Sequence, residues 1–406
     1  MTRRRVVVIT HTAEIGGAEA ALLKLLAELD RERFEPYAVV FAHGPLVSRL
    51  RALGIPTRVL PLGRAGAVTR TETSSLPALA GAAAGTAAFV PRLVRALRSS
   101  GAELAIANSL KAATVLAAAA PLAGLPWVWQ LHDRLASDYL PARTAWAMRG
   151  LARVGPRCVV VNSEAVRTTL GRIRPERSVV AYPGLDDAGF AHPRAETFER
   201  PERPLIGILG RISATKGQRE FVEAARRLAA DHPGARFRIV GAALFQDGDY
   251  EHALRAEVAR AGLDELIEFA GWSDDPAAAI RALDLLVHAS PVPEPFGQVV
   301  VEAMAAGVPV VATDAGGVPE ILDPDGSAVA VADGVRRSEL GILARPGDAG
   351  ALARAIRLAL DDPGAAREAA ARARLSALAR FTAAGTARTA EGAWARALPE
   401  IGGIAH

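Results

Sequence analysis

Short runs of apolar, mostly β-branched residues alternate along this chain with longer stretches rich in alanine, leucine and arginine. The short runs are continuously apolar, which is typical of parallel strands buried on both faces, and the longer stretches have helical spacing. The pattern predicts an α/β fold with helices on both faces of a parallel sheet. In the first half, strands are predicted at residues 6–9, 37–41, 57–60, 104–107, 127–131, 158–162 and 178–181, and helices at 18–29, 45–53, 90–98 and 112–120.

The alternation stops near Pro183-Gly184, passes through a polar segment and then starts again. Because 406 residues are too many for one ordinary hydrophobic core, two domains are expected. We predict two doubly wound Rossmann-like domains, residues 1–185 and 186–375, facing each other across a cleft. A helical tail at residues 376–406 either stays on the second domain or crosses back to the first. The strands predicted in the second half are residues 205–209, 237–240, 267–269, 285–288 and 309–312.

The segment PVPEPFGQVVVEAMAAGVPVVATDAGGVPE carries two carboxylates, Glu294 and Glu302, with seven residues between them. The Pro-Phe-Gly sequence at 295–297 predicts a turn that opens a helix, and the glycine pair at 316–317 predicts a loop. A helix start presents free N–H groups and partial positive charge to an anion, while carboxylates accept hydrogen bonds from hydroxyls. The segment therefore suits a ligand with both phosphates and hydroxyls, such as a nucleotide-sugar.

A basic loop directly follows the strand predicted at residues 205–209. It contains Arg211 and Lys216, and Gly210 and Gly217 on either side keep it open. The forked donors of arginine and the point charge of lysine both suit a diphosphate. A solvated basic loop is the alternative. We favour the phosphate because ligands of open α/β sheets bind at the carboxyl ends of strands.

Two weaker candidates lie in the first half. Gly16-Gly17 would let the backbone approach a ligand at a helix start, or would simply form a strand-to-helix turn. His132 follows the strand at 127–131 and either contacts a sugar near developing charge or makes a structural hydrogen bond. Trp127 and Trp129 alternate with valine and are assigned to the core.

Residues after two further strands are candidates for a nucleotide base. Gly241 follows residues 237–240, and Gly271-Trp272 follows residues 267–269. No G-x-G-x-x-G sequence is present, which weakens a dinucleotide dehydrogenase interpretation. The acidic pairs at 247/249, 274/275 and 323/325 have glycine or proline within or beside them, so turns explain them better than a metal site.

Charge and cysteine content narrow the class of protein. The net charge is only +4 and basic residues are not interleaved with aromatics, so nucleic acid is not a predicted partner. Cys158 is the sole cysteine, which fits a reducing compartment. The uncharged stretches 73–91 and 112–132 are interrupted by proline and glycine and are not expected to span a membrane. The expected location is cytoplasmic, with at most a peripheral contact at the inner membrane face.

The sequence EPFGQVVVE resembles the E-x7-E motif of the retaining glycosyltransferases of family 4, which have the GT-B fold. The resemblance covers nearly the whole chain and keeps the family's order of motifs. The other matching positions are Gly16-Gly17, His132-Asp133, Asn162-Ser163, Gly184 with Asp186, Gly210-Arg211 with Lys216-Gly217, and Asp284 with Ser290.

The resemblance implies a role for each candidate. Arg211 and Lys216 would hold the donor diphosphate, and Glu302 would accept from the ribose hydroxyls. Glu294 would contact the donor sugar and His132 would lie near its anomeric centre, so the implied catalytic set is His132, Glu294, Arg211 and Lys216. The remaining donor-binding positions are Gly16, Gly17, Gly210, Gly241, Trp272, Phe296, Gly297, Gln298 and Val299. The family's reaction retains the anomeric configuration and needs no bound metal or other cofactor.

The predicted function is transfer of a hexose-type sugar from a nucleoside-diphosphate sugar to an acceptor hydroxyl. The acceptor would be a glycan, a lipid-linked molecule or a small-molecule natural product. The alternative functions are a glycoside hydrolase using the two glutamates, a GT-B nucleotide-sugar epimerase, a phosphorylase, and a non-catalytic GT-B partner subunit. The basic loop is unexplained in a hydrolase, and no signal indicates the pyridoxal-bearing lysine of a phosphorylase.

Acceptor recognition is expected in the first domain, through the loop at residues 63–75 and the segment after His132. Arg134, Arg143, Arg149 and Arg153 would face either an anionic lipid carrier or solvent. Two positions depart from the family pattern: Pro183 stands where asparagine is common, and Gln298 stands where apolar residues are common.

Overall fold

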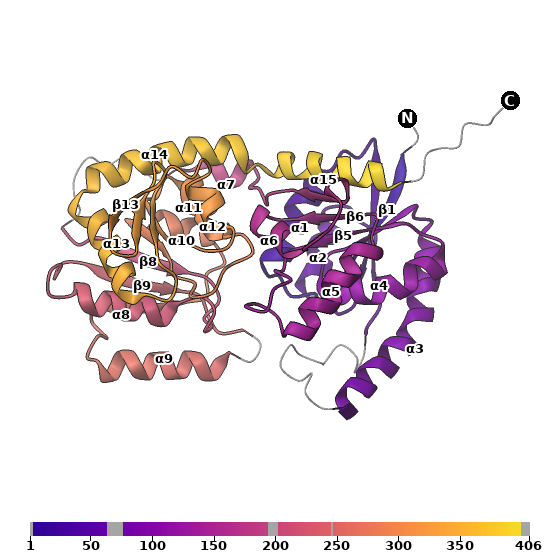
Figure 1. Cartoon of the computed structure of the whole chain (residues 1–406), viewed down its shortest axis with the longest axis horizontal. Coiled ribbons are helices and arrows are strands. Elements are labelled where there is room, and N and C mark those ends of the chain that lie inside the picture. The colour runs from indigo at the N-terminus through magenta and orange to yellow at the C-terminus, as the bar shows by residue number, and fades with distance from the viewer. Residues whose placement is uncertain (1–2, 63–75, 194–201, 245–246, 399–406) are drawn as a thin grey trace. The chain divides into compact units, whose positions relative to one another are not determined.

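The computed structural model describes residues 3–62, 76–193, 202–244 and 247–398. The chain forms two compact units (Figure 1): unit 1 comprises Met1–Gly184 with Ala383–His406, and unit 2 comprises Leu185–Thr382. The predicted boundary at 185/186 lies within two residues of the observed one. The predicted tail divides, because its first residues complete a helix of unit 2 and the rest returns to unit 1. The loop predicted at 63–75 lies outside the described residues.

Unit 1 contains a seven-stranded parallel sheet with the order β3-β2-β1-β4-β5-β6-β7. Every strand predicted in the first half is confirmed. The strands are β1 (Arg4–Thr10), β2 (Phe34–Val40), β3 (Thr57–Val59), β4 (Leu104–Ala107), β5 (Trp127–Leu131), β6 (Cys158–Val161) and β7 (Ser178–Val180). The helices are α1 (Gly17–Ala27), α2 (Pro45–Ala52), α3 (Leu76–Ser100), α4 (Leu110–Ala123), α5 (Ala142–Val154), α6 (Glu164–Thr169), the 3-10 turn η2 (Pro175–Arg177) and α15 (Ala383–Ala397).

The sheet of unit 1 separates two hydrophobic cores. Val7 and Ile9 of β1 face the core beneath α3 and α4, and the alternate residues of β1 face the core beneath α1, α2 and α15. Trp127 and Trp129 are buried, as predicted. Burial on both faces is why the strands read as continuous apolar runs.

Helix α15 is anchored to unit 1 by apolar and ionic contacts. The Trp394 ring packs edge-on against Phe34 at 5.7 Å between centroids. The buried Glu391 carboxylate accepts from the Asp30 backbone N–H at 2.8 Å and pairs with Arg33 at 3.2 Å. A buried carboxylate with two partners is a specific contact, which explains why the end of the chain belongs to the first unit.

Unit 2 contains an eight-stranded sheet with the order β10-β9-β8-β11-β12-β15-β14-β13, in which only β14 runs antiparallel to its neighbours β15 and β13. The strands are β8 (Leu205–Leu209), β9 (Arg236–Val240), β10 (Ile267–Gly271), β11 (Leu285–His288), β12 (Val310–Thr313), β13 (Val329–Ala332), β14 (Val335–Arg337) and β15 (Ile342–Ala344). The helices are α7 (Asp187–Ala191), α8 (Gln218–Leu228), α9 (Gly248–Arg260), α10 (Pro276–Arg281), α11 (Gln298–Ala306), α12 (Val318–Leu322), α13 (Ala349–Asp361) and α14 (Pro363–Arg380).

The prediction of two Rossmann-like α/β domains is confirmed, with β13, β14 and β15 as additions that the sequence pattern did not reveal. None of the helices in the described parts of the chain has an apolar stretch long enough to cross a bilayer. Within each unit, the carboxyl ends of the parallel strands lie along one edge of the sheet, and the predicted site residues follow those ends.

Candidate functional site

The basic loop after β8 is held in place by polar side chains and glycines. The buried Gln218 side chain donates to the Arg211 carbonyl at 2.9 Å and accepts from the Ser213 N–H at 3.3 Å. Gly217 has a φ of +79°, and a Cβ there would lie 1.9 Å from the Ala289 carbonyl oxygen. A side chain at Gly217 would therefore push the loop away from the end of β11.

Ser290 makes the second attachment of this loop. Its hydroxyl lies 2.6 Å from the Thr215 carbonyl and 2.8 Å from the Val292 carbonyl. Ser290 therefore ties the residue before Lys216 to the segment that leads to Glu294. The loop after β8 and the loop after β11 are thus held together by the Ser290 hydroxyl. Both loops follow the carboxyl ends of strands.

The ammonium group of Lys216 pairs with Oε1 of Glu294. On the other side of the carboxylate, His288 Nε2 lies 3.3 Å from Glu294 Oε2, and His288 Nδ1 lies 3.1 Å from the Thr313 hydroxyl. The side chains of His288 and Glu294 are only 5% and 11% exposed. Glu294 is thus a largely buried carboxylate between a lysine and a histidine.

Electrostatics keep Glu294 ionised. Burial raises its pKa, but Lys216 and His288 together outweigh burial and hold the pKa well below its ordinary value. A carboxylate whose charge is stabilised in this way accepts hydrogen bonds and does not supply a proton at neutral pH. This argues against Glu294 as a general acid.

The backbone around Glu294 is clamped by the predicted glycine loop. The Gly317 N–H donates to the Glu294 carbonyl at 3.0 Å, and a Cβ on Gly316 would lie 2.0 Å from that same oxygen. Gly316 also has a φ of +66°, which favours glycine. The glycine pair therefore positions the Glu294 segment and need not touch a ligand.

Helix α11 begins at Gln298, directly after this segment. Its N-cap Gly297 has a φ of +111°, and the Phe296 side chain is buried against Phe381 at 5.7 Å. Phe296 can therefore offer a ligand only its backbone. No described side chain caps the helix start. The Val300 N–H donates to the Gly297 carbonyl at 3.0 Å, which leaves the N–H groups of Gln298 and Val299 available for an anion.

Gln298 and Glu302 lie one turn apart on α11. The Gln298 amide donates to Glu302 Oε1 at 3.1 Å, and both residues are half-buried, as is Val299. The unusual glutamine thus orients the second carboxylate of the motif. Glu294 lies in a loop and Glu302 lies in a helix, and the two carboxylates have different partners. They therefore do not form the matched carboxylate pair that a glycoside hydrolase uses.

The remaining predicted residues of unit 2 also follow strand ends. Arg211 pairs with Asp247 at 3.3 Å, and Trp272 is 57% exposed while its indole N–H donates to Asp274 at 3.1 Å. Gly241 has a structural reason to be glycine, because a Cβ would lie 2.0 Å from the Gly210 carbonyl oxygen. The two glycines therefore let the loops after β8 and β9 cross closely.

In unit 1, Gly16 and Gly17 are exposed at the start of α1, after β1. The buried Glu19 carboxylate accepts from the Gly16 N–H at 3.2 Å, which is the half of a capping box that a glycine N-cap allows. Burial raises the pKa of Glu19, opposed by these backbone hydrogen bonds. The Gly16 N–H, which was predicted to approach the donor phosphate, thus already donates to a side chain.

His132 lies between two asparagines from the neighbouring strands. Its Nε2 is 3.0 Å from Asn108 Oδ1, and the Asn162 amide lies 3.4 Å from the His132 carbonyl. A narrow pocket in unit 1 is lined by His132 and Asn162, with Gln130, Pro183 and Thr386. Burial lowers the pKa of His132 to about 4, although Asp133 opposes the shift, so the ring is neutral at pH 7.

The structure thus forms two clusters from the predicted residues, each described within its own unit. Unit 2 brings together Lys216 and Glu294, and unit 1 surrounds His132 with polar groups. Sequence reasoning missed the supporting residues His288, Gln218, Asn108 and Glu19. Asn108 could have been predicted from the sequence, because it is polar and directly follows a buried strand. His288 is the last residue of an apolar strand, so the sequence pattern assigns it to the hydrophobic core.

The acidic pairs have structural partners. Asp275 caps α10 by accepting from the Ala278 N–H at 2.8 Å. Asp323 accepts from the Ala328 N–H at 2.9 Å and pairs with Arg336 at 2.7 Å. Across the described residues, no group of three or more histidine, cysteine, aspartate or glutamate side chains has the arrangement of a metal site.

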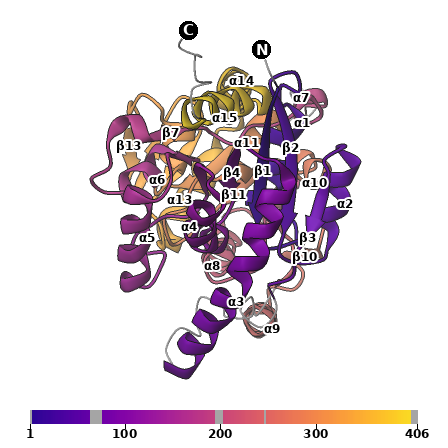
Figure 2. The same cartoon turned by 90° about the vertical axis from the view of Figure 1, so that its right-hand side faces the viewer.

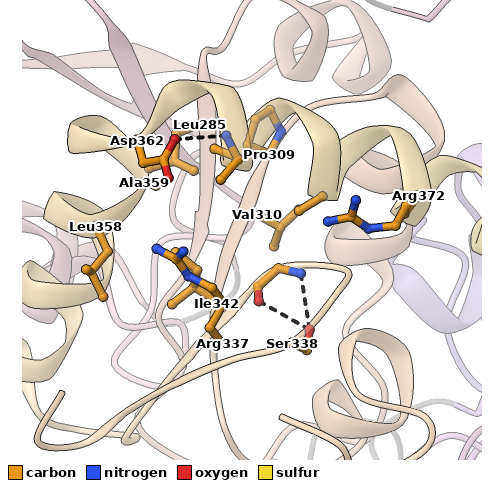
Figure 3. Close-up of a pocket in the computed structure, with 14 residues that line it drawn as sticks. Leu285, Pro309, Val310, Arg337, Ser338, Ile342, Leu358, Ala359, Asp362 and Arg372 are labelled. Atoms are coloured by element: carbon orange, nitrogen blue, oxygen red, sulfur yellow. Dashed lines mark hydrogen bonds between the residues drawn. The ribbon is translucent and has the colours of Figure 1, made fainter. Parts of the chain in front are cut away.

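A pocket of about 170 Å³ in unit 2 lies away from the predicted site (Figure 3). Leu285, Val310 and Ile342 line it, and they are the first residues of β11, β12 and β15. The pocket is therefore at the amino ends of the strands, opposite the edge that carries Glu294. Two of its polar side chains already bind the backbone: Asp362 caps α14, and Arg372 donates to the Glu339 carbonyl at 3.0 Å.

Comparisons with known families match both units. Residues 15–188 match the model of "Glycosyltransferase Family 4", and residues 192–376 match that of "Glycosyl transferases group 1". A solved structure of Anabaena Alr3699/HepE in complex with UDP and glucose is 27% identical, with a TM-score of 0.78, covering 97% of this chain and 100% of that one. The predicted GT-B fold is confirmed by this likeness.

Two glycosyltransferases illustrate the sequence relatives. The 2-deoxystreptamine glucosyltransferase of Streptomyces kanamyceticus is 30% identical over 272 residues, which cover 60% of this chain and 64% of that enzyme. The 2-deoxystreptamine N-acetyl-D-glucosaminyltransferase of Streptomyces fradiae is 32% identical over 239 residues, covering 52% and 55%. The chain thus matches less than two thirds of the length of either relative.

Proposed function

Because the chain belongs to the glycosyltransferases of group 1 and family 4 by both of its domains, we propose that it moves a hexose-type sugar from a nucleoside-diphosphate donor to an acceptor hydroxyl, with retention of configuration. The solved relative with bound UDP and glucose supports a uridine nucleotide as the first donor to test. The acceptor would be a glycan, a lipid-linked molecule or a natural product, and relatives named for 2-deoxystreptamine support the last class.

One observation carries the proposal: Lys216 meets Glu294 immediately before the start of α11. In a nucleotide-sugar, the anomeric carbon is bonded to a phosphate oxygen, so a phosphate cation and a sugar-binding carboxylate must be close neighbours. Lys216 and Glu294 have that proximity, and the free N–H groups of α11 add a second anion-binding element. A donor would draw Lys216 toward its phosphates and leave Glu294 to accept from sugar hydroxyls.

The chemistry follows from where charge develops. The bond between the anomeric carbon and the phosphate oxygen breaks, a new bond to the acceptor oxygen forms, and the acceptor proton passes to the departing phosphate. Arg211, Lys216 and the α11 N–H groups would stabilise the growing phosphate charge more than the ground state. The leaving phosphate receives the proton, so neither a side-chain base nor a metal ion is required.

The nucleoside would be recognised by residues farther along the same edge of unit 2. Glu302, oriented by Gln298, would accept from the ribose hydroxyls. The exposed Trp272 ring would lie against the base, and the glycine crossing at 210 and 241 would let the backbone approach it.

His132 would contribute from unit 1. Since Oδ1 of Asn108 can only accept, Nε2 carries the ring proton and Nδ1 is the acceptor of the neutral ring. We propose that His132 accepts a hydrogen bond from a hydroxyl of the transferred sugar. Gly16 and Gly17 would approach the donor phosphate through the backbone.

The direct test incubates the protein with UDP-hexoses and a panel of hydroxylated acceptors, in EDTA, and follows UDP release and the product's anomeric proton by NMR. We expect acceptor-dependent release and the same anomeric configuration in donor and product. An inverted product would contradict retention. A changed donor sugar without any acceptor would indicate an epimerase, and activity restored only by a divalent ion would contradict metal independence.

A further inference from the structure

Helices α3, α4 and α5 pack side by side on one side of the sheet of unit 1 (Figure 2). Their sequences contain no aspartate or glutamate, although acidic residues are frequent elsewhere in the chain. We call this surface the α3–α5 face. Its basic residues are Arg92, Arg95, Arg98, Lys111, Arg143, Arg149 and Arg153.

Helix α5 carries large apolar side chains in water beside these charges. Trp146 is 74% exposed and Val154 is 82% exposed, among exposed arginines at 143 and 153. Positions 143, 146, 150 and 153 follow one another at steps of three or four residues, and position 154 lies four residues after 150, so all five share one helix face. Leu122, 59% exposed, lies in the last turn of the neighbouring helix α4.

The arginines of α5 have no carboxylate partner among the described residues, and another basic side chain lies beside them. The Arg177 guanidinium donates to the Arg153 carbonyl. Arg134 differs, because it pairs with Asp138 at 2.8 Å and its side chain is only 12% exposed. Of the four arginines considered from the sequence, the three on α5 are therefore free to meet an external anion.

We propose that the α3–α5 face docks on an anionic lipid bilayer, with Trp146 at the level of the headgroups and the arginines on lipid phosphates. Tryptophan is favoured at membrane interfaces, and a basic helix with exposed apolar side chains lies in that interface. Each arginine near an anionic surface adds attraction that salt screens. A soluble polyanion would pair with the arginines but would leave the exposed apolar side chains of Val154 and Leu122 in water. The inference does not depend on the proposed sugar transfer.

The test is flotation of the full chain with phosphatidylcholine vesicles that contain or lack phosphatidylglycerol. We expect binding only to the anionic vesicles, weakened by salt, and a blue shift of tryptophan fluorescence on binding. Trp146→Ala and the double variant Arg143→Glu with Arg153→Glu should each weaken binding about fivefold or more. Leu375→Ala on α14 and Arg260→Glu on α9 are matched exposed controls that should bind like wild type.

Circular dichroism would establish that each variant is folded before its binding is compared. The proposal is overturned if anionic vesicles do not bind wild type, or if neutral vesicles bind equally well. Binding that survives both the Trp146 and the arginine substitutions would place the contact elsewhere. Retention on immobilised heparin without any binding to vesicles would identify the face as a site for soluble polyanions.

Discussion

Lys216 and Glu294 are ion-paired although they are 78 positions apart in the chain. The sequence predicts Lys216 as a ligand of the donor phosphates and Glu294 as a ligand of the donor sugar, but it does not predict that the two side chains contact each other. The pair shows that the basic loop after β8 and the E-x7-E segment converge on one point. A donor bound as proposed would have to replace this ion pair, so each residue would affect how the other meets its ligand.

Replacing Lys216 by alanine should reduce sugar transfer by about ten- to a thousandfold, because the departing phosphate loses a charged contact. The measurement is kcat/KM for UDP release, with folding checked by circular dichroism. Arg226→Ala, which removes an exposed cation from α8, is the control and should retain activity. Near-wild-type turnover of a folded Lys216 variant would remove this residue from the site.

Glu302→Ala should weaken binding of UDP by about tenfold or more, since the ribose loses a charged acceptor. Isothermal calorimetry with UDP measures this without any acceptor. Gln298→Ala should have a smaller effect in the same direction, because it only orients Glu302. Glu257→Ala, in a surface pair with Arg219, is the matched control. Unchanged affinity in the Glu302 variant would contradict the ribose role.

Glu294 should make stability depend on pH in the acid range. Its pKa in the folded chain lies well below the ordinary 4.5, so the folded carboxylate stays charged where the unfolded one is protonated. The stabilisation is complete above pH 4.5 and is lost as pH falls toward the folded pKa. The difference in Tm between wild type and Glu294→Gln should therefore narrow below about pH 4.5. A difference that stays constant down to pH 3 would show that Glu294 is not held ionised.

His132 should be neutral throughout the physiological range. Burial lowers its pKa to about 4, so its ring resonances should titrate near that pH, assigned by their loss in His132→Gln. Because the unfolded histidine binds a proton below its ordinary pKa of 6.5 and the folded one does not, this contribution to stability falls between pH 6.5 and 4. A midpoint near 6.5 would contradict a desolvated ring.

Much of this arrangement could be predicted because strand ends are visible in the sequence. Arg211 and His132 directly follow apolar runs, and in parallel sheets such positions gather at one edge. The distinct E-x7-E spacing similarly indicated a loop carboxylate and a helical one. Local pattern and the carboxyl-edge rule were sufficient for these residues.

Other features depend on contacts that leave no local pattern. His288 is the last residue of a buried strand, and it contacts the site only because the Glu294 carboxylate lies against its ring. The hairpin of β13 and β14 was missed because its strands are short and partly exposed, and Arg336 interrupts the apolar run to pair with Asp314 and Asp323. The return of α15 to unit 1 depends on Glu391, which reads as an ordinary surface residue in a helical tail.

The central claim is that unit 2 holds a nucleoside-diphosphate sugar around Lys216 and Glu302. The most direct measurement is a thermal-shift panel of nucleoside diphosphates and nucleotide-sugars on wild type, Lys216→Ala and Glu302→Ala, because a ligand that binds only the native state raises Tm. We predict a saturable rise in Tm for wild type with UDP or a UDP-hexose, and a smaller rise in both variants. No rise with any nucleotide, or an equal rise in all three proteins, would contradict the account.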